Sequence, residues 1–382
     1  MGLSDALFEL LRFEMDGTKC SSNIDNLMIS DSVEKLFKLS KQHDLAHLVG
    51  DALDKNDLLP DGSEIKKRFL RERNMAVYRY EQMQYEIEQI CDTLEKAKIP
   101  FIPLKGAVIR DYYPEPWMRT SCDVDILVKE EDLPVAIDVL TRGLNYRYER
   151  TGSHDAHLFA ENGVHLELHY KLNDGNQKWD HVLARVWEYS SAETDYRYAL
   201  TKEMFYLYHI THMAGHFKVG GCGIRPFLDL SLLRKYNVYN QEILSGLLQQ
   251  AGLAAFNEAV CGLAEYWFAD GQTSTTTQTL AEFILNSGMY GDMKNRVAIE
   301  KNKKGGIRFL FSRIFLSYNE LKFKYPKLQK RPILFPFYQV KRWFNLLKKD
   351  RRKKSLQELS ETTRGDVKRQ ERVAKLLKDL DL

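Results

Sequence analysis

Cysteine is scarce in this sequence, and long apolar runs and sorting signals are missing. The 382 residues include five cysteines with no CxxC spacing, which argues against a zinc knuckle or a disulfide framework and favours a reducing compartment. No window holds the about eighteen apolar residues that a membrane span needs. The N-terminal residues lack the basic segment and apolar core of a secretory signal, and Ala6 stands where a myristoylation signal has Ser or Thr. We therefore expect a cytoplasmic protein.

The sequence also has no internal repeat and no recognisable nucleic-acid-binding module, so a nucleic-acid substrate is not supported. Its formal net charge of +3 is unevenly distributed. Residues 301–382 contain 24 Lys+Arg and 8 Asp+Glu, a net charge of +16, whereas the rest of the chain carries −13. A basic end on an acidic body predicts an anionic partner, or docking of the end onto the body.

One candidate partner of the basic end is an anionic membrane surface. The Lys/Arg-rich run 348–354 follows Trp343, Phe344 and Leu347, and this mixture of basic and bulky apolar residues is typical of segments that lie on such a surface. Peripheral membrane association of a cytoplasmic protein is one interpretation, and a solvated helix end is the other.

The length predicts two or three structural units, and the residue patterns divide the chain into four regions of an α+β protein. Short β-like runs alternate with helical ones in the second region, which predicts a small mixed sheet that leans on flanking helices for its core. The regions are an N-terminal helical region 1–98, an α/β core 99–172, a helical domain 173–300 that closes a cleft, and a basic, amphipathic helical region 301–382. The apolar face predicted in the last region consists of Ile307, Leu310, Phe311, Ile314 and Phe315.

Within these regions the patterns predict individual elements. A long, charged helix without Pro is predicted over 64–98. The predicted strands are 101–104, 124–128, 146–150, 157–159 and 164–170, and the predicted helices between them are 107–113 and 132–142.

Two aspartates stand at the start of the second predicted strand. Asp123 and Asp125 are two residues apart and therefore share one face of the strand. Neighbouring carboxylates repel each other unless a cation lies between them, and a divalent metal is the leading explanation. A third carboxylate is expected on a neighbouring strand, where Glu167 shares a face with His165 and His169. These three acids suit Mg²⁺ or Mn²⁺ in phosphoryl or nucleotidyl transfer, and Glu167 could also orient or deprotonate an acceptor hydroxyl.

Basic residues supply a matching phosphate side. The turn at Lys105 and Gly106 lets the backbone approach a phosphate closely, and the helix after it would point its free N–H groups there. Lys105 adds a positive charge, and Arg119 lies four residues before Asp123. Arg225, farther along the chain, is a candidate phosphate or substrate contact.

Simpler interpretations of these residues remain open. Asp123 could end a turn before the strand, Glu167 could be a solvated residue, and Lys105 could form an ion pair with one of the aspartates. His165 and His169 could bind a transition metal together with Glu167, although the aspartates favour a hard cation.

Downstream, His209, His212 and His216 share one helical face, where a zinc site competes with ordinary hydrogen-bonded histidines. His216, Arg225 and Asp229 could form the far wall of the cleft or brace its helices.

These motifs, taken in order, resemble the nucleotidyltransferase superfamily with the polymerase-β-type palm, and most closely its bacterial branch named "nucleotidyltransferase family protein". The matching positions are Leu104-Lys105-Gly106, Tyr113-Pro114, Arg119, the Asp-Val-Asp run at 123–125, and His-Leu-Glu-Leu-His at 165–169. The better-known members have Gly-Ser where this chain has Lys105-Gly106, and more often have Asp where it has Glu167.

The resemblance implies a polymerase-β-like core that uses Mg²⁺ or Mn²⁺, binds an NTP and passes NMP to the hydroxyl of an unidentified acceptor. In this interpretation Asp123, Asp125 and Glu167 are the catalytic metal ligands. Lys105, Gly106, Arg119 and Arg225 bind the nucleotide phosphates. The missing Ser leaves two alternatives open, namely a catalytically idle nucleotide-binding or scaffold module, and a phosphotransferase that uses the same site.

Overall fold

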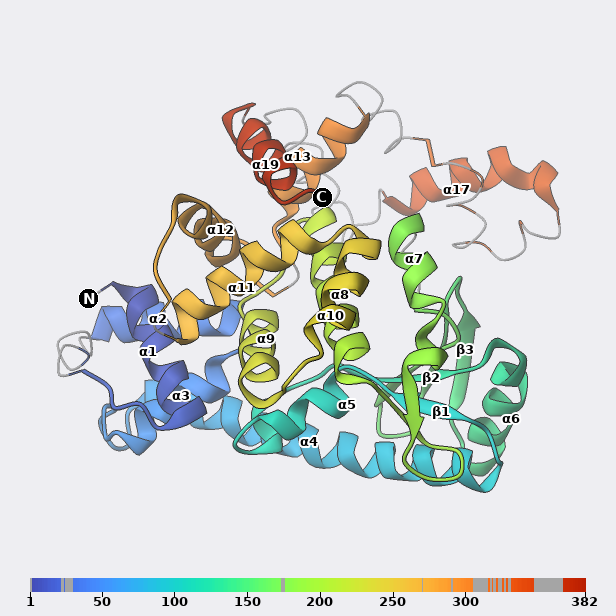
Figure 1. Ribbon diagram of the computed structural model, residues 1–382, viewed down its shortest axis with the longest axis horizontal. Helices are drawn as coiled ribbons and strands as arrows, with labels where there is room; N and C mark the ends of the chain where they lie inside the picture. Colours follow the sequence, from blue (N-terminus) through green and yellow to red (C-terminus); the bar gives the residue numbers. More distant parts are fainter. Residues whose placement is uncertain are drawn as a thin grey trace. The chain divides into compact units, whose positions relative to one another are not determined.

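A computed structural model of the chain (Figure 1) describes residues 2–21, 24, 30–172, 176–269, 271–289, 291–304, 315–316, 318, 321, 325, 328, 331–346 and 367–382. The chain divides into two compact units. The first contains Met1–Gly215, Gly223–Glu282 and Asp381, and the second contains His216–Cys222, Phe283–Leu380 and Leu382. The four regions inferred from the sequence stay a prediction. Among the described residues, no helix is long and apolar enough to cross a membrane.

The first unit begins with four helices, of which the last is the longest. They are α1 (Leu3–Asp16), α2 (Ser30–Gln42), α3 (Ala46–Lys55) and α4 (Glu64–Lys96). Ser63 caps α4 by accepting a hydrogen bond from the Lys66 N–H. The buried residues Phe69, Ala76, Met83 and Ile90 recur every seventh position of α4, which places them along one stripe of the helix. The long helix predicted over 64–98 is therefore confirmed.

A five-stranded mixed sheet follows α4. Its strands are β1 (Phe101–Pro103), β2 (Asp123–Val128), β3 (Arg147–Thr151), β4 (Asp155–Phe159) and β5 (His165–His169), in the order β1-β2-β5-β4-β3. Only the β2–β5 pair is parallel. The helices α5 (Gly106–Ile109) and α6 (Leu133–Gly143) lie between strands in the sequence. The predicted α+β class, the mixed sheet and the positions of its strands are confirmed.

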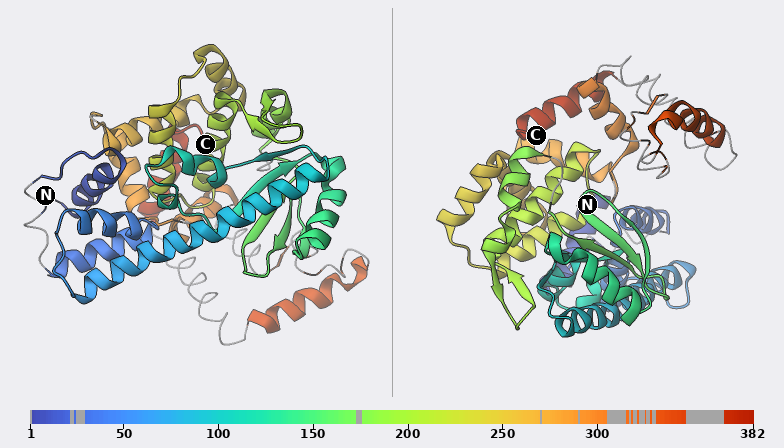
Figure 2. Two further views of the ribbon diagram at one scale, coloured as in Figure 1. Left: turned by 90° about the horizontal axis from the view of Figure 1, so that it is seen from below. Right: turned by 90° about the vertical axis from the view of Figure 1, so that its right-hand side faces the viewer.

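The two faces of this sheet differ in chemistry because side chains alternate along each strand. Val124, Ile126 and Val128 of β2 join Leu166 and Leu168 of β5 in a core that also contains buried residues of α4 and α6, and the views in Figure 2 show these helices beside the sheet. The residues between them point to the opposite face. On β2, β5 and β4 that second face carries Asp123, Asp125, His165, Glu167, His169, Asp155 and His157.

One part of the helical prediction for 173–300 is wrong. Two short strands, β6 (Ser190–Ala192) and β7 (Tyr198–Leu200), form an antiparallel hairpin there. The Phe101 N–H of β1 donates to the Tyr196 carbonyl at 2.9 Å, so the hairpin loop covers part of the edge strand of the main sheet. Strands of three residues are too short for their alternation to be recognised in the sequence.

The other main elements of this region are helices. They are α7 (Gln177–Leu183), α8 (Lys202–Lys218), α9 (Arg225–Tyr236), α10 (Gln241–Ala251), α11 (Ala254–Phe268) and α12 (Thr275–Leu285). Short 3₁₀ helices occur at Arg110–Tyr112, Pro116–Met118, Glu130–Asp132, Val186–Tyr189 and Pro332–Leu334.

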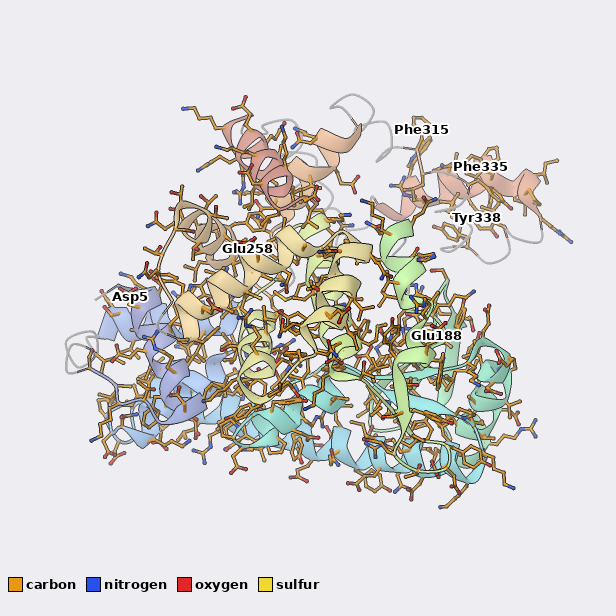
Figure 3. The ribbon with its side chains drawn as sticks, in the orientation of Figure 1. Asp5, Glu188, Glu258, Phe315, Phe335 and Tyr338 are labelled. Atoms are coloured by element: carbon orange, nitrogen blue, oxygen red, sulfur yellow. The ribbon has the colours of Figure 1, made fainter. Side chains whose placement is uncertain are left out.

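The second unit is helical where the structure describes it. It contains α13 (Met293–Lys304), α17 (Phe335–Leu346) and α19 (Val367–Asp379). Arg369 of α19 donates to Asp292 and Asn295 at the start of α13. Tyr338 of α17, which Figure 3 labels, packs with Leu321 and Leu328. Most of the apolar face predicted at 307–315 and the basic run 348–354 lie outside the described residues.

Candidate active site

The parallel register of β2 and β5 brings the predicted carboxylates onto one face of the sheet. Asp125 pairs with Glu167, and Asp123 pairs with His165. One ligand atom each from Asp125, Glu167 and His169 lie within 4.8 Å of one another. Asp123 is not a member of that group, although it shares the face. Two of the three predicted carboxylates and His169 therefore lie together, and Asp123 shares their face of the sheet.

Asp125 is the most enclosed of these acids, with only 3% of its side chain exposed. The Lys105 Nζ lies 2.7 Å from Asp125 Oδ1, and the His169 Nε2 lies 2.8 Å from the same oxygen. Burial alone would raise the pKa of Asp125, but the positive charge of Lys105 and the hydrogen bond from His169 outweigh it and hold the pKa well below its usual range. Asp125 is therefore charged at neutral pH, and its Oδ2 receives no hydrogen bond from any described residue.

Lys105 occupies an unusual backbone conformation for a residue with a side chain. Its φ is +44° and its ψ is −117°, and such geometry costs about 1–3 kcal/mol and persists only where the surrounding contacts impose it. Burial favours the neutral amine, but Tyr208 and Asp125 outweigh this effect and place the pKa of Lys105 above its ordinary value. The ion pair with Asp125, which the sequence left as an alternative, is present.

Glu167 has the opposite electrostatic character to Asp125. Its burial and the negative charges of Asp125 and Asp123 raise its pKa to about 7. The pKa of Asp123 is raised as well, first by burial and then by Asp125. Burial and the neighbouring negative charges thus disfavour the charged forms of these two carboxyl groups, and no described residue donates a hydrogen bond to Asp125 Oδ2. The donor set is mostly carboxylate oxygen, so it fits a hard divalent cation such as Mg²⁺ or Mn²⁺.

The raised pKa of Glu167 predicts a stability that depends on pH in metal-free buffer. Between the ordinary pKa of 4.5 and about 7, the folded state binds a proton that the unfolded state has lost. Stability should therefore fall as the pH rises through this window, by at most about 3 kcal/mol. Urea unfolding in EDTA at several pH values between 4.5 and 8 measures this decline, and Glu167→Gln should flatten it. An equally steep decline in Glu167→Gln would show that Glu167 is not its source.

A second cluster lies next to Glu167 on the same face. His157 Nδ1 is 2.9 Å from His165 Nε2 and 3.9 Å from Glu167 Oε1, and ligand atoms of these three residues also lie within 4.8 Å of one another. In the alternative that the sequence leaves open, His165, His169 and Glu167 bind one transition metal. The structure places the two histidines in separate groups around Glu167, His165 with His157 of β4 and His169 with Asp125.

Gly106 lies at the start of α5 against the loop that leads into β2. A Cβ atom at this position would be 2.1 Å from Ser121 Oγ and 3.3 Å from Ser121 Cβ. The helix after the turn has only four residues before it continues as a 3₁₀ turn. The absence of a side chain is therefore required by packing of the turn against Ser121, whatever binds there.

Replacing Gly106 with alanine should destabilise the protein by about 1–3 kcal/mol, because Ser121 and its loop must move. The Gly106→Ala/Ser121→Gly double variant removes both clashing atoms and should recover much of the loss. Gly246→Ala is the matched control, since a Cβ there meets nothing within 4 Å. Chemical unfolding of the four proteins tests this account, which fails if Gly106→Ala is as stable as the control.

Arg119 is hydrogen-bonded to an acidic residue of a helix that lies much later in the sequence. Its Nε and Nη2 each donate to Asp229 of α9 at 2.9 Å, and its Nη1 donates to the Thr120 carbonyl at 2.6 Å. The Tyr113 hydroxyl donates to the same Asp229 at 2.7 Å. Arg119 nevertheless lies close enough to Asp123 to work against the rise in its pKa. Its direct contact with a phosphate stays a prediction, whereas its role in fixing the loop before β2 is visible.

Arg225 braces the same loop from the other side. Its Nη1 donates to Asp44 Oδ2 at 2.7 Å and to Thr120 Oγ1 at 2.9 Å. His47 Nε2 lies 2.8 Å from the Met118 carbonyl. The structure thus gives Arg225 the bracing role that the sequence left open, and its phosphate contact stays a prediction. Sequence reasoning missed Asp44 and His47, because nothing near them indicates contact with residues about seventy positions away.

His209, one of three histidines on α8, is buried and hydrogen-bonded. Its Nε2 lies 2.9 Å from the Pro226 carbonyl, and burial lowers its pKa. This is the ordinary structural environment of a histidine, the alternative to a zinc ligand in the sequence analysis.

Comparison with known proteins agrees with the chemistry of this site. A family model described as "uncharacterised nucleotidyltransferase" matches residues 30–269. The match covers more than half of the chain and includes the sheet, the candidate carboxylates and Asp229. A comparison with curated proteins finds no match. The chain therefore belongs to this family of uncharacterised nucleotidyltransferases.

Proposed function

We propose that this protein is a metal-dependent nucleotidyltransferase that passes NMP from an NTP to an acceptor hydroxyl. The observation that carries the proposal is the β2–β5 register, which sets Asp125 opposite Glu167 and leaves Asp123 on the same face. Membership of the family supports transfer of a nucleotide as the reaction. Acidic side chains gathered from two adjacent strands suit the metal ions that assist such a transfer.

In this proposal Asp123, Asp125 and Glu167 hold Mg²⁺ or Mn²⁺. The metal would neutralise phosphate charge and stabilise the oxygens that enter and leave. His169 keeps Asp125 oriented through the hydrogen bond to Oδ1. Glu167, with its pKa near 7, is suited to take a proton from the acceptor hydroxyl when it is not bound to the metal.

The basic residues form the phosphate side of the proposed site. Lys105 neutralises the charge of Asp125 in the structure. When a metal ion neutralises Asp125 instead, the Lys105 side chain would be available to contact the nucleotide phosphates. Gly106 allows close approach of the backbone, and Arg119 adds positive charge beside Asp123. Arg225 would act on this side chiefly by holding Thr120.

The proposal extends to the fold and to the cell. We infer that the sheet is a polymerase-β-like core of the bacterial branch, because an Asp-x-Asp strand follows a strand, turn and helix and pairs in parallel with the strand of the third acid. We also propose a cytoplasmic location with peripheral membrane binding by the basic C-terminal region, whose charge supports it.

Nucleotides labelled at different phosphates test the reaction. NTPs carrying the label on the α-phosphate should transfer it to an acceptor in the presence of Mg²⁺, and NTPs labelled on the γ-phosphate should not. Asp123→Asn should abolish the transfer, whereas Asp138→Asn, an exposed control, should not. Transfer of the γ-label instead would identify a phosphotransferase, and α-label transfer by Asp123→Asn at the wild-type rate would refute the assigned site.

The ion pair of Lys105 with Asp125 favours a second candidate, an idle nucleotide-binding or scaffold module. A lysine that occupies a metal-binding carboxylate is expected where metal binding has been lost. This candidate predicts nucleotide binding that does not respond to Mg²⁺. If the module is idle, removing the lysine in Lys105→Ala would still leave nucleotide transfer undetectable across a broad panel of acceptors. In an active enzyme whose lysine can be displaced, nucleotide binding would respond to Mg²⁺.

A further inference from the structure

A pocket of about 440 Å³ lies between α2 and α4 and is separate from the carboxylates on the sheet. Its walls come from α2, the loop after α2, α3, α4 and Thr120. Phe37 and Ala76 are buried, and Met75 gives the pocket an exposed apolar surface. The rest of the lining is polar or charged, and a concave site of this kind suits a small molecule that itself carries charge.

The charges in this pocket are not balanced. Lys41 is paired with Glu72 at 2.5 Å, and Arg68 is paired with Glu34 at 2.5 Å. Asp44, the other acid of the pocket wall, is paired with Arg225. Every carboxylate of the wall therefore already has a cationic partner.

Two arginines of the pocket wall have no acidic partner among the residues that the structure describes. Arg71 and Arg79 lie on α4, are exposed, and make no hydrogen bond or ion pair with any residue that the structure describes. They are eight positions apart, with Met75 midway, so they follow one stripe of the helix over about 12 Å. Free guanidinium groups beside an apolar surface are suited to bind a phosphate or carboxylate with two hydrogen bonds each.

A short stretch of chain connects the pocket to the candidate active site. Thr120 lines the pocket, and Asp123 of the carboxylate face is three residues later. Three residues span at most about 11 Å between α-carbons. The same loop is held by Asp44 and Arg225 from the pocket side and by Asp229 through Arg119.

We propose that this pocket binds an anionic group of the acceptor, with Arg71 and Arg79 as its ligands. The acceptor is then a small molecule that bears a phosphate or carboxylate at one end and the reacting hydroxyl at the other. This inference rests on the proposed nucleotidyl transfer, because it assigns the second substrate of that reaction. The nucleotide phosphates belong at Asp123 and Asp125, so the pocket and the nucleotide are occupied together.

Binding of glucose 6-phosphate, with glucose as the neutral comparison, tests the pocket by calorimetry in EDTA. The wild type and the Asp123→Asn/Asp125→Asn variant should both bind the phosphate and not glucose. Arg71→Gln/Arg79→Gln should weaken binding by at least about tenfold. Lys35→Gln/Lys38→Gln is the matched control, because it removes two exposed charges of α2 outside the pocket and should leave binding unchanged.

The proposal is overturned if Arg71→Gln/Arg79→Gln binds like the wild type, if the lysine control loses as much, or if the wild type binds no sugar phosphate. It is also overturned if a Mg²⁺-bound NTP analogue competes with the sugar phosphate, since the pocket would then hold nucleotide phosphates. The proposed function fails by a separate result, nucleotide binding that ignores Asp123→Asn/Asp125→Asn. Far-UV circular dichroism checks that each variant is folded, which is expected for the exposed arginine and lysine substitutions.

Discussion

Asparagine at position 125 is expected to lower nucleotidyl transfer by at least about a thousandfold and to destabilise the protein as well. The catalytic loss follows because metal coordination contributes several kcal/mol to the transition state. The stability loss follows because Asp125 is the counter-ion of Lys105, whose side chain is only 22% exposed. Removing one member of a buried pair leaves the other uncompensated, and the partial exposure of Lys105 limits the cost to about 1–3 kcal/mol.

Asparagine at position 123 should separate the two effects. The pKa of Asp123 is raised, so its charge is disfavoured in the folded state at neutral pH. Asp123→Asn should therefore lose activity to a similar degree and keep or gain stability in metal-free buffer. Transfer assays and urea unfolding of both variants measure these outcomes. Wild-type activity in Asp125→Asn, or equal destabilisation by the two changes, would contradict the electrostatic account of the site.

Breaking the pair between Arg119 and Asp229 is expected to have the largest effect on stability. Asp229 is 1% exposed at its side chain and accepts hydrogen bonds from Arg119 and Tyr113. Asp229→Asn leaves the Arg119 guanidinium buried without a counter-charge, which costs about 3–5 kcal/mol. Asp138→Asn is the matched control, because the Asp138–Arg142 pair is exposed and should be worth at most about 0.5 kcal/mol.

The same pair predicts that the stability of the protein falls at acidic pH. Burial would raise the pKa of Asp229, but Arg119 outweighs it and holds the pKa below its ordinary value. The stabilisation by this group is complete above the unfolded pKa of about 3.9 and is lost as the pH falls through the folded pKa. Urea unfolding at pH 7 and below pH 4 should show this loss in the wild type but not in Asp229→Asn. Equal stability of Asp229→Asn and the wild type at pH 7 would contradict the structural role of the pair.

The candidate site was predictable where local periodicity carries the information. Asp123 and Asp125 stand two residues apart in a run with apolar neighbours, and Glu167 alternates with His165 and His169 in the same way. Period-two alternation fixes which side chains share a face. It does not fix which strands are neighbours, and the parallel pairing of Asp125 with Glu167 came from the structure.

The supporting contacts were not predictable because they join residues far apart in the chain. Arg119 pairs with Asp229 across 110 positions, and Arg225 pairs with Asp44 across 181. No local pattern at either end specifies such a partner. The hairpin around Tyr196 was missed for a related reason, since its pairing with Phe101 depends on the edge strand that it meets.

The most direct test of the proposed metal-dependent site is nucleotide binding with and without Mg²⁺. Calorimetry with an NTP analogue that carries a methylene between the α- and β-phosphates measures binding without turnover. The wild type and Asp92→Asn/Asp138→Asn, which alters two exposed aspartates, should bind it in Mg²⁺ and lose most of the affinity in EDTA. Asp123→Asn should bind it at least about tenfold more weakly in Mg²⁺. Equal affinity of Asp123→Asn and the wild type in Mg²⁺ would contradict the proposed site.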